Sequence, residues 1–322
     1  YKPKGTETIR MAEDLKDRAV PGIERSVPAD VRGLMATCDV QKNRWEVQVM
    51  GIRPGYHLND DGSKTYLDGI FDIVVIDRFA VVKSNRTDED GERLWVKPAT
   101  HLEDWDLLVT QVMDKRYPLF DGSGDMGIHM TFCDSGGKDG VTGKAYDFYR
   151  KLKRDGRHER FHLIKGEAHP KAPRAQVSYP DTARKDRNVK ARGEIPVLFL
   201  QTNLIKDTLN GMLDKVEPGG GYVEFPDWLA LQFYEELTVE IRTLKGWENP
   251  AGRRNESWDL LVYFIGACIS RGVERADWTK PPTWLMPWAA NPAVAITKVV
   301  KAEVDKPGQP PHRLRDLGAQ LA

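Results

Sequence analysis

Residues 32–41 read RGLMATCDVQ, and residues 44–54 read RWEVQVMGIRP. Both stretches are rich in apolar residues, and only a short Gln-Lys-Asn segment joins them. Two apolar runs connected by so tight a turn predict a β-hairpin. The next apolar run, FDIVVIDRFAVV at 71–82, is dense in Val and Ile and predicts a third strand.

The chain after the third strand alternates between helical and strand periodicity. We predict helices at 102–117, 144–156, 227–246 and 255–272, strands at 127–137, 160–166 and 221–226, and a strand running into a helix at 194–213. Gly156 and Gly272 are expected to end two of these helices, because glycine readily adopts the left-handed conformation found there. The order of elements indicates an α/β domain, with a mixed sheet flanked by helices.

Three segments lie outside this periodic pattern. Residues 1–30 are polar and predict a short helix and a linker that arrives from an upstream domain. Residues 167–193 carry three prolines and more basic than acidic residues, so we expect a loop or a β-ribbon. Residues 276–322 are rich in Pro and Trp and then in Lys and Pro, which predicts an extended tail. The periodic domain is therefore placed at residues 31–275.

The composition limits the classes of function. The chain has 322 residues and is 40% hydrophobic, so a sizeable core is possible. Its 48 Lys and Arg residues balance its 48 Asp and Glu residues, so any nucleic-acid contact must come from a local basic patch. Cys38, Cys133 and Cys268 are too scattered for a disulfide framework or a zinc ribbon, and we expect reduced thiols. Every apolar run is shorter than the roughly 18 residues of a membrane-spanning helix.

Three aspartates occur where a charge is unexpected. Asp39 and Asp134 each close an apolar run that ends in Cys, and Asp259 lies inside an apolar helix. If the two strands pair in parallel, Asp39 and Asp134 leave the sheet at the same edge. Cys38 and Cys133 would then face the opposite side, because strand residues alternate. A role in a turn or a helix cap is the alternative for each aspartate taken alone.

Clustered carboxylates suit Mg²⁺ or Mn²⁺, which prefer oxygen ligands. Two such ions, held roughly 3.5–4 Å apart, can activate water and stabilise the leaving oxygen in phosphodiester hydrolysis. Glu256 precedes Asp259 by three residues, shares its helix face and is a further candidate ligand. For Asp259 the alternative is an ion pair with Arg253 or Arg254.

Four sequence features extend this pattern. They are Asp39 at the end of the first strand, Asp134-Ser135-Gly136-Gly137, Lys165-Gly166 and Arg254-Asn255-Glu256-Ser257-Trp258-Asp259, with Asp77-Arg78 in the third strand as a weaker fifth. In this order, from about residue 32 to residue 271, they resemble the nuclease domain of phage terminase large subunits of the lambda type. The ordered set carries the resemblance, since a lone Asp-x-Gly-Gly is a weak signal.

The resemblance implies an RNase H-like fold in which Asp39, Asp134 and Asp259 are catalytic and bind two Mg²⁺ or Mn²⁺ ions. It implies a metal-dependent endonuclease that cuts concatemeric phage DNA during genome packaging in the host cell cytoplasm. The implied partners are double-stranded DNA, the terminase small subunit, the capsid portal protein and the ATPase domain that lies upstream in the same large subunit.

The chain also departs from a complete large subunit. No segment matches the phosphate loop G-x-x-x-x-G-K-[ST], and GSGDMG at 122–127 lacks the Lys-Ser/Thr end, so we interpret it as a turn. We therefore expect the nuclease without its motor, and no ATPase activity.

Other titratable residues in the strands receive mainly structural interpretations. Asp77 is a weaker candidate for the metal set, and a structural ion pair is favoured for it. Arg78 cannot share its face, because neighbouring strand residues alternate. We expect His129 and His162 to be hydrogen-bonded core residues rather than ligands.

Two basic clusters could meet DNA phosphates. The first, Lys151, Lys153 and Arg154, is interpreted mainly as a solvated helix face. The second lies in the irregular 167–193 segment and could clamp a phosphate backbone; it comprises Lys171, Arg174, Arg184, Lys185, Arg187, Lys190 and Arg192. We add Lys165, of the Lys-Gly motif, to the predicted DNA contacts.

Two other functions remain open. The chain could be another RNase H-like nuclease, of the resolvase or transposase kind. It could also be a non-catalytic module that docks a packaging motor onto the capsid portal, with Trp278, Trp284 and Trp288 as anchors on a stiff proline-rich backbone. The alternative for these tryptophans is that they fold back over the domain.

Overall fold

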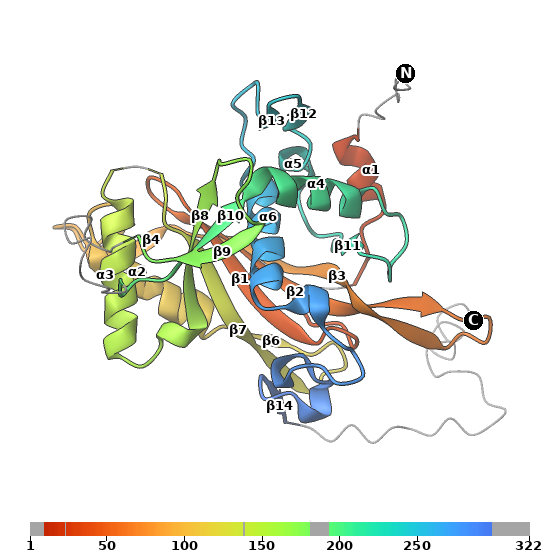
Figure 1. Cartoon of the computed structure of the whole chain (residues 1–322). Helices are drawn as coiled ribbons and strands as arrows, with labels where there is room; N and C mark the ends of the chain where they lie inside the picture. Colours follow the sequence, from red (N-terminus) through yellow and green to blue (C-terminus); the bar gives the residue numbers. More distant parts are fainter. Residues whose placement is uncertain (1–9, 23, 138, 181–192, 298–322) are drawn as a thin grey trace, which may run out of the picture.

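The computed structural model describes residues 10–22, 24–137, 139–180 and 193–297. A mixed sheet of ten strands runs through it, with the path β11-β3-β2-β1-β7-β8-β10-β9 and with β6 and β14 paired to β7 (Figure 1). The strands are β1 Gly33–Val40, β2 Trp45–Leu58, β3 Lys64–Val81, β6 Arg116–Pro118, β7 Gly124–Asp134, β8 Phe161–Glu167, β9 Ala175–Ser178, β10 Val197–Gln201, β11 Val223–Glu224 and β14 Val294–Ile296.

The predicted hairpin and third strand are confirmed. β1, β2 and β3 pair antiparallel in sequence order, and Gln41 N donates to Arg44 O across the first turn at 2.9 Å. On its other side β1 pairs in parallel with β7, which pairs in parallel with β8, and β8 with β10. The sheet therefore has an antiparallel half and a parallel half that meet at β1.

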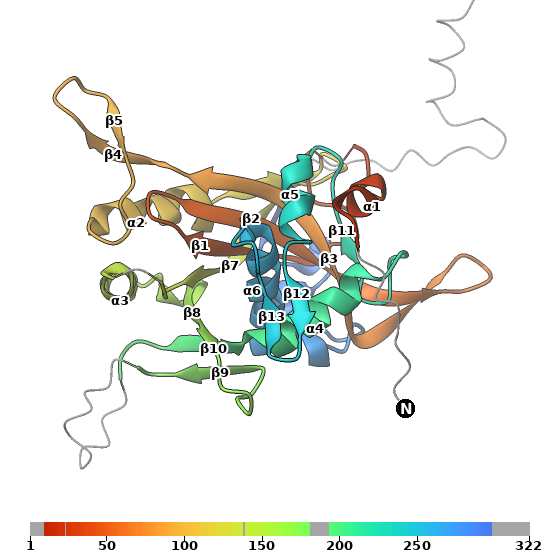
Figure 2. The ribbon, with the colours of Figure 1, turned by 90° about the horizontal axis from the view of Figure 1, so that it is seen from above.

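Helices cover both faces of the sheet (Figure 2). The helices α2 Leu102–Leu108 and α3 Val141–Arg154 lie on one face, and α4 Thr202–Leu213, α5 Leu231–Glu236 and α6 Glu256–Ser270 lie on the other. Successive side chains of β1 point to opposite faces of the sheet and so enter different halves of the core. Leu34, Ala36 and Cys38 pack with α2 and α3, whereas Met35 packs with α4 and α6. This is the expected α/β fold.

The remaining elements are short. They are α1 Ala12–Asp17, the π-helical turn η1 Val109–Met113, the single turns η2 His158–Arg160, η3 Val273–Arg275, η4 Thr283–Leu285 and η5 Trp288–Ala290, and the two-stranded pairs β4 Lys83–Thr87 with β5 Arg93–Trp95 and β12 Ile241–Thr243 with β13 Gly246–Glu248. In the part of the chain that the structure describes, no helix is long and apolar enough to cross a membrane.

The helix predicted at 227–246 is wrong over most of its length. Only Leu231–Glu236 is helical, and β12 and β13 follow as a hairpin. The β-branched residues Thr238, Val239 and Ile241 favour extended backbone, and Gly246 has a φ of +126°, which a helix does not accommodate. The helix predicted at 102–117 ends early in η1, before β6.

The short helix predicted near the N-terminus is present as α1, and Val27 farther along that segment is completely buried. The segment 122–127 forms a turn at Gly122, where Ser123 N donates to Asp121 Oδ1 at 2.9 Å, and then enters β7.

The described part of the C-terminal segment, 276–297, is not an extended tail. Trp278 and Trp284 are only 3% and 7% exposed, and the Trp288 Nε1 group donates to Val31 O at 2.8 Å. The Asn291 Nδ2 group donates to Arg32 O at 2.6 Å, and β14 then pairs with β7. Proline prevents a helix here, but the indole rings still bury apolar area against the domain. Residues 298–322 lie outside the described residues.

Candidate active site

The parallel pairing of β1 with β7 brings two of the predicted aspartates together. Cys38 and Cys133 are register partners, so Asp39 and Asp134 follow at the same end of neighbouring strands. Both thiols are buried in the core beside α2 and α3. Alternation along each strand places Asp39 and Asp134 on the other face, the one that α6 covers.

Asp259 reaches this place from α6. The Thr37 Oγ1 hydroxyl of β1 donates to Leu260 O at 3.0 Å, which fixes the helix against the strand. Gly266, farther along α6, allows a close approach to the sheet, because a Cβ there would lie 2.5 Å from Leu200 Cδ1 of β10. The start of α6 is thereby held over the ends of β1 and β7.

The electrostatics show that the three carboxyl groups act on one another. Burial raises the pKa of Asp39 to about 7, and Asp134, Asp259 and Glu256 add repulsion, which a hydrogen bond from Gln41 opposes. Burial likewise raises the pKa of Asp259 to about 6, with Lys206 opposing it and repulsion from Glu240 and Asp134 adding to it. The three aspartates, called the acidic cluster below, thus form a site where negative charge is undercompensated.

Asp134 is oriented by the turn that follows β7. Burial raises the pKa of Asp134, while the backbone N–H groups of Gly136 and Ser135 and the charge of Lys165 lower it. Gly136 N donates to Asp134 Oδ1 at 3.1 Å, and Ser135 Oγ donates to Ile164 O at 2.8 Å. Gly137 completes the turn with a φ of +94°, a conformation that favours glycine. The turn of the Asp-x-Gly-Gly motif therefore holds this carboxylate through its backbone N–H groups.

Two charged residues near Asp259 were not predicted. Lys206 Nζ, from α4, lies 2.7 and 2.8 Å from the carboxylate oxygens of Glu240 and 3.4 Å from Asp259 Oδ1. The Asn255 Nδ2 group donates to both Asp259 Oδ2 at 3.1 Å and Glu240 Oε1 at 2.8 Å. Asp259 therefore has these partners, and not Arg253 or Arg254.

Glu256 belongs to an ionic network beside the acidic cluster. Its carboxylate lies 3.5 Å from Arg44 and 3.2 Å from Arg254. Glu46, the register partner of Asp39 on β2, lies 2.5 Å from Arg44 and 3.0 Å from Arg254, and it also pairs with Arg78 at 2.7 Å. Sequence reasoning missed Glu46, although the hairpin register could have revealed a second carboxylate opposite Asp39.

Asp77 forms structural ion pairs, which was the favoured prediction for it. It is 1% exposed and accepts from Arg25 Nε at 3.0 Å, Lys115 Nζ at 2.8 Å and Tyr117 OH at 2.9 Å. Tyr117 belongs to the core beside α2 and α3, so Asp77 faces away from the acidic cluster, and Arg78 turns to the opposite face as expected. Its weaker interpretation as a metal ligand is therefore not supported by these contacts.

His129 and His162 are half-buried and stack on buried aromatic rings. His129 lies parallel to Trp284 with ring centroids 4.5 Å apart, and His162 stacks on Phe132 at 4.8 Å. Burial, with repulsion from Arg271, lowers the pKa of each to about 4. His162 has the expected hydrogen bond, with the backbone of Glu159, whereas within the described residues the Nε2 atom of each ring has no hydrogen-bond partner.

The predicted DNA contacts have different surroundings in the structure. Lys165 follows the β8 residue that pairs with Asp134 and lies close enough to lower the pKa of that aspartate. Arg174 is held by Glu274 at 2.8 and 2.9 Å, and Lys151 by Asp106 at 2.7 Å. Five of the predicted contacts fall outside the described residues; they are Arg184, Lys185, Arg187, Lys190 and Arg192.

The donor set of the acidic cluster suits a hard divalent cation, because it consists of carboxylate oxygens. Within residues 10–22, 24–137, 139–180 and 193–297, however, no group of three or more His, Cys, Asp or Glu side chains is arranged so that it could hold a metal ion. The carboxylates are in electrostatic range of one another without forming a preassembled metal cage.

Comparison with known proteins identifies the family. The family model described as terminase large subunit gpA, endonuclease domain, matches residues 1–278. Neither the curated proteins nor the solved structures gave a match. The ten-stranded mixed sheet with helices on both faces is consistent with an RNase H-like nuclease domain. Since the match covers most of the 322 residues, the chain belongs to the family of terminase large subunit endonuclease domains.

Proposed function

We propose that this packaging endonuclease cuts concatemeric phage DNA by two-metal-ion hydrolysis at the acidic cluster. The observation that supports the proposal is the convergence of Asp39, Asp134 and Asp259 at one partly buried position, with desolvation and mutual repulsion raising the pKa values of Asp39 and Asp259. A cluster of carboxylates whose charge is undercompensated favours binding of a cation.

Mg²⁺ or Mn²⁺, bound by Asp39, Asp134 and Asp259, would supply an activated water and stabilise the charge that develops on the leaving oxygen. Because the carboxylates of the described residues are not arranged as a cage, ion binding would have to draw them together. Glu256 is the further candidate ligand, and it would first have to loosen its pairs with Arg44 and Arg254.

The surrounding residues would orient the carboxylates and the substrate. Gly136 N fixes one oxygen of Asp134, and Lys206 with Asn255 fixes Asp259. Lys165, close to Asp134, would attract the scissile phosphate, and the predicted basic clamp at 184–192 would hold the flanking backbone. The proposed partners are double-stranded DNA, the terminase small subunit, the capsid portal protein and an ATPase domain upstream in the same large subunit.

The two alternative functions have less support. The family match favours a terminase over a resolvase-like nuclease. A non-catalytic docking module drew its support from exposed tail tryptophans, and Trp278 and Trp284 are instead buried against the domain.

Nicking of supercoiled plasmid DNA tests the proposal. Wild-type protein with Mn²⁺ or Mg²⁺ should produce open circles, and EDTA should prevent this. Asp134→Asn should remove the activity, whereas Asp106→Asn, which changes a half-exposed carboxylate paired with Lys151, should keep it. A second measurement is the thermal shift caused by Mn²⁺, which should be positive for the wild type and absent in Asp134→Asn. Metal-independent nicking, or equal shifts in both proteins, would contradict the proposal.

A further inference from the structure

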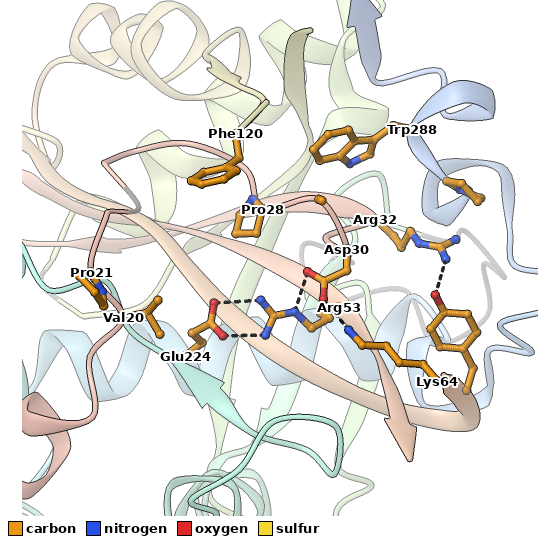
Figure 3. Close-up of a pocket in the computed structure, with 13 residues that line it drawn as sticks. Val20, Pro21, Pro28, Asp30, Arg32, Arg53, Lys64, Phe120, Glu224 and Trp288 are labelled. Atoms are coloured by element: carbon orange, nitrogen blue, oxygen red, sulfur yellow. Dashed lines mark hydrogen bonds and ion pairs between the residues drawn. The ribbon is translucent and has the colours of Figure 1, made fainter. Parts of the chain in front are cut away.

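A cavity of about 700 Å³ lies at the end of β1 remote from the acidic cluster (Figure 3). Arg32 lines it just before β1, whereas Asp39 lies near the other end of the strand, roughly 20 Å away at the usual rise per residue. A ligand in this cavity would therefore not compete directly for the acidic cluster.

The charges that line the cavity leave one cation uncompensated. Arg53 is buried and binds both oxygens of Glu224 at 2.7 and 2.9 Å and Asp30 at 2.9 Å. Lys64 takes the other oxygen of Asp30 at 3.4 Å. These contacts use both carboxylates of the lining and leave Arg32 without one.

Arg32 is the polar group that points to a ligand. It is only 9% exposed, yet no carboxylate among the described residues pairs with it. Its side chain donates from Nη2 to Tyr66 OH at the long distance of 3.4 Å, and its guanidinium lies 5.6 Å from the centre of that ring. Figure 3 shows the Arg32 side chain on one side of the cavity, apart from the Arg53–Glu224 pair. The guanidinium of this largely buried residue faces the cavity without an anion beside it, and a carboxylate would pair with it.

The lining also offers aromatic and proline surface. Phe120 is 58% exposed, and Trp288 lies on the same side of the cavity in Figure 3. Pro21, Pro28 and Pro287 add rigid apolar surface. Rigid aromatic and proline surfaces bind an extended peptide with little loss of conformational entropy.

We propose that this cavity binds an acidic segment of a partner protein, whose carboxylate pairs with Arg32 and whose neighbouring apolar side chain packs on Phe120 and Trp288. The lining has three cations and two carboxylates, so one added negative charge would balance it. Duplex DNA fits the cavity poorly, because successive phosphates would face Asp30 and Glu224. The inference is independent of the chemistry proposed for the acidic cluster.

Selection from a phage-displayed random decapeptide library on the 322-residue chain tests this inference. Peptides that carry Asp or Glu beside an aromatic or aliphatic residue should be enriched, and their affinity for Arg32→Met should fall at least tenfold. Lys64→Met, which removes a cation already paired with Asp30, is the matched control and should change affinity less than threefold. Enriched peptides without acidic residues, peptides that bind Arg32→Met equally well, or a failure to enrich any sequence would overturn the inference.

Two further measurements distinguish a peptide site from a structural arginine and from a small-anion site. Thermal unfolding tests the structural role, because a cation without a carboxylate should stabilise the fold little. Arg32→Met should keep or raise the melting temperature, and a clear fall would assign Arg32 to the fold instead. Titration of inorganic phosphate and of a short DNA duplex should give no binding that depends on Arg32. Such binding would indicate a small-anion or nucleic-acid site and overturn the protein partner.

Discussion

Cys38 and Cys133 are register partners across the parallel pair β1–β7, and the residue after each of them is an aspartate. This relationship turns two similar stretches of sequence, far apart in the chain, into one site. The thiols pack into the core beside α2 and α3, and strand alternation turns Asp39 and Asp134 toward α6. The acidic cluster is therefore a consequence of sheet register, to which α6 adds Asp259.

Replacing an aspartate of the acidic cluster with Asn should abolish nicking without unfolding the domain. Each change removes a buried negative charge from a group of repelling carboxylates, so the melting temperature of the metal-free protein should stay the same or rise. Nicking assays and differential scanning fluorimetry on Asp39→Asn, Asp134→Asn and Asp259→Asn measure both effects. Near wild-type nicking by Asp134→Asn would show that the assignment is wrong.

Asp77→Asn should lower stability and leave nicking intact, the reverse of the result expected for the acidic cluster. The change leaves Tyr117 and two cations around a neutral amide, and Arg25 and Lys115 are exposed enough to be partly rehydrated. We expect a loss of about 1–3 kcal/mol in the free energy of unfolding, and metal-dependent nicking that is retained. Urea unfolding gives the first quantity. If Asp77→Asn instead unfolds like the wild type and fails to cut DNA, Asp77 acts in the reaction after all.

Local patterns in the sequence were enough to predict the central strands and the meeting of Asp39 with Asp134. The apolar runs identify the strands, and period-two alternation together with parallel pairing then determines which side chains share an edge. The position of Asp259 near them came from the ordered motifs of the resemblance, because α6 is apolar on nearly every side and its spacing does not single out one face.

Features that depend on tertiary contacts could not be predicted in this way. Lys206 lies on an amphipathic helix, where a lysine is ordinarily solvated, and its contact with Glu240 joins residues 34 positions apart. The hairpin β12–β13 follows a short helix in a segment whose apolar residues also fit helical spacing. The tail tryptophans have no periodicity that reveals which surface covers them. In each case packing, rather than local preference, decides the outcome.

The raised pKa of Asp39 predicts how stability depends on pH without metal. An unfolded Asp titrates near 3.8, whereas Asp39 in the folded protein titrates at about 7, so between these values the folded state binds the extra proton. Its contribution to stability is therefore largest at low pH and is lost as pH rises through about 7. Relative to Asp39→Asn, metal-free wild type should lose of order a few kcal/mol of unfolding free energy between about pH 4 and 7.

Urea unfolding of both proteins in EDTA across this range measures the difference. Carboxylates remote from the acidic cluster titrate alike in the two proteins, so their effects cancel, and the difference reports on Asp39 together with the carboxylates coupled to it. Parallel stability curves would mean that Asp39 does not titrate abnormally. Because metal ligands must be deprotonated, the Mn²⁺-induced thermal shift should also be larger at about pH 8 than at about pH 6.

The basic residues at 184–192 should determine much of the affinity for duplex DNA. Changing Arg184, Lys185 and Arg187 to Ala should weaken binding and lower the salt slope by about 0.9 for each phosphate that the variant no longer neutralises. Fluorescence anisotropy of a labelled duplex over a series of salt concentrations measures the slope. Lys151→Ala is the control, since Lys151 is already paired with Asp106. An unchanged slope in the triple variant would show that the phosphates are met elsewhere.

Trp284→Ala should destabilise the domain, because Trp284 packs over Gly33 and stacks on His129. A Cβ on Gly33 would lie 3.0 Å from the indole, so the two surfaces are in close contact. We expect a loss of about 3 kcal/mol in the free energy of unfolding, as is typical when a buried aromatic ring is removed. Trp95→Ala is the matched control, since Trp95 is 51% exposed on the β4–β5 hairpin, and it should cost less than about 1 kcal/mol.

Two truncations extend this test to the whole C-terminal segment. Ending the chain at residue 276 removes Trp278, Trp284 and β14 and should lower the melting temperature by several degrees. Ending it at residue 297 keeps these elements and should leave melting temperature and nicking unchanged. If packaging is nevertheless lost in the second truncation, residues 298–322 dock onto a partner such as the capsid portal. Equal stability of the two truncated proteins would contradict the assignment of 277–297 to the domain core.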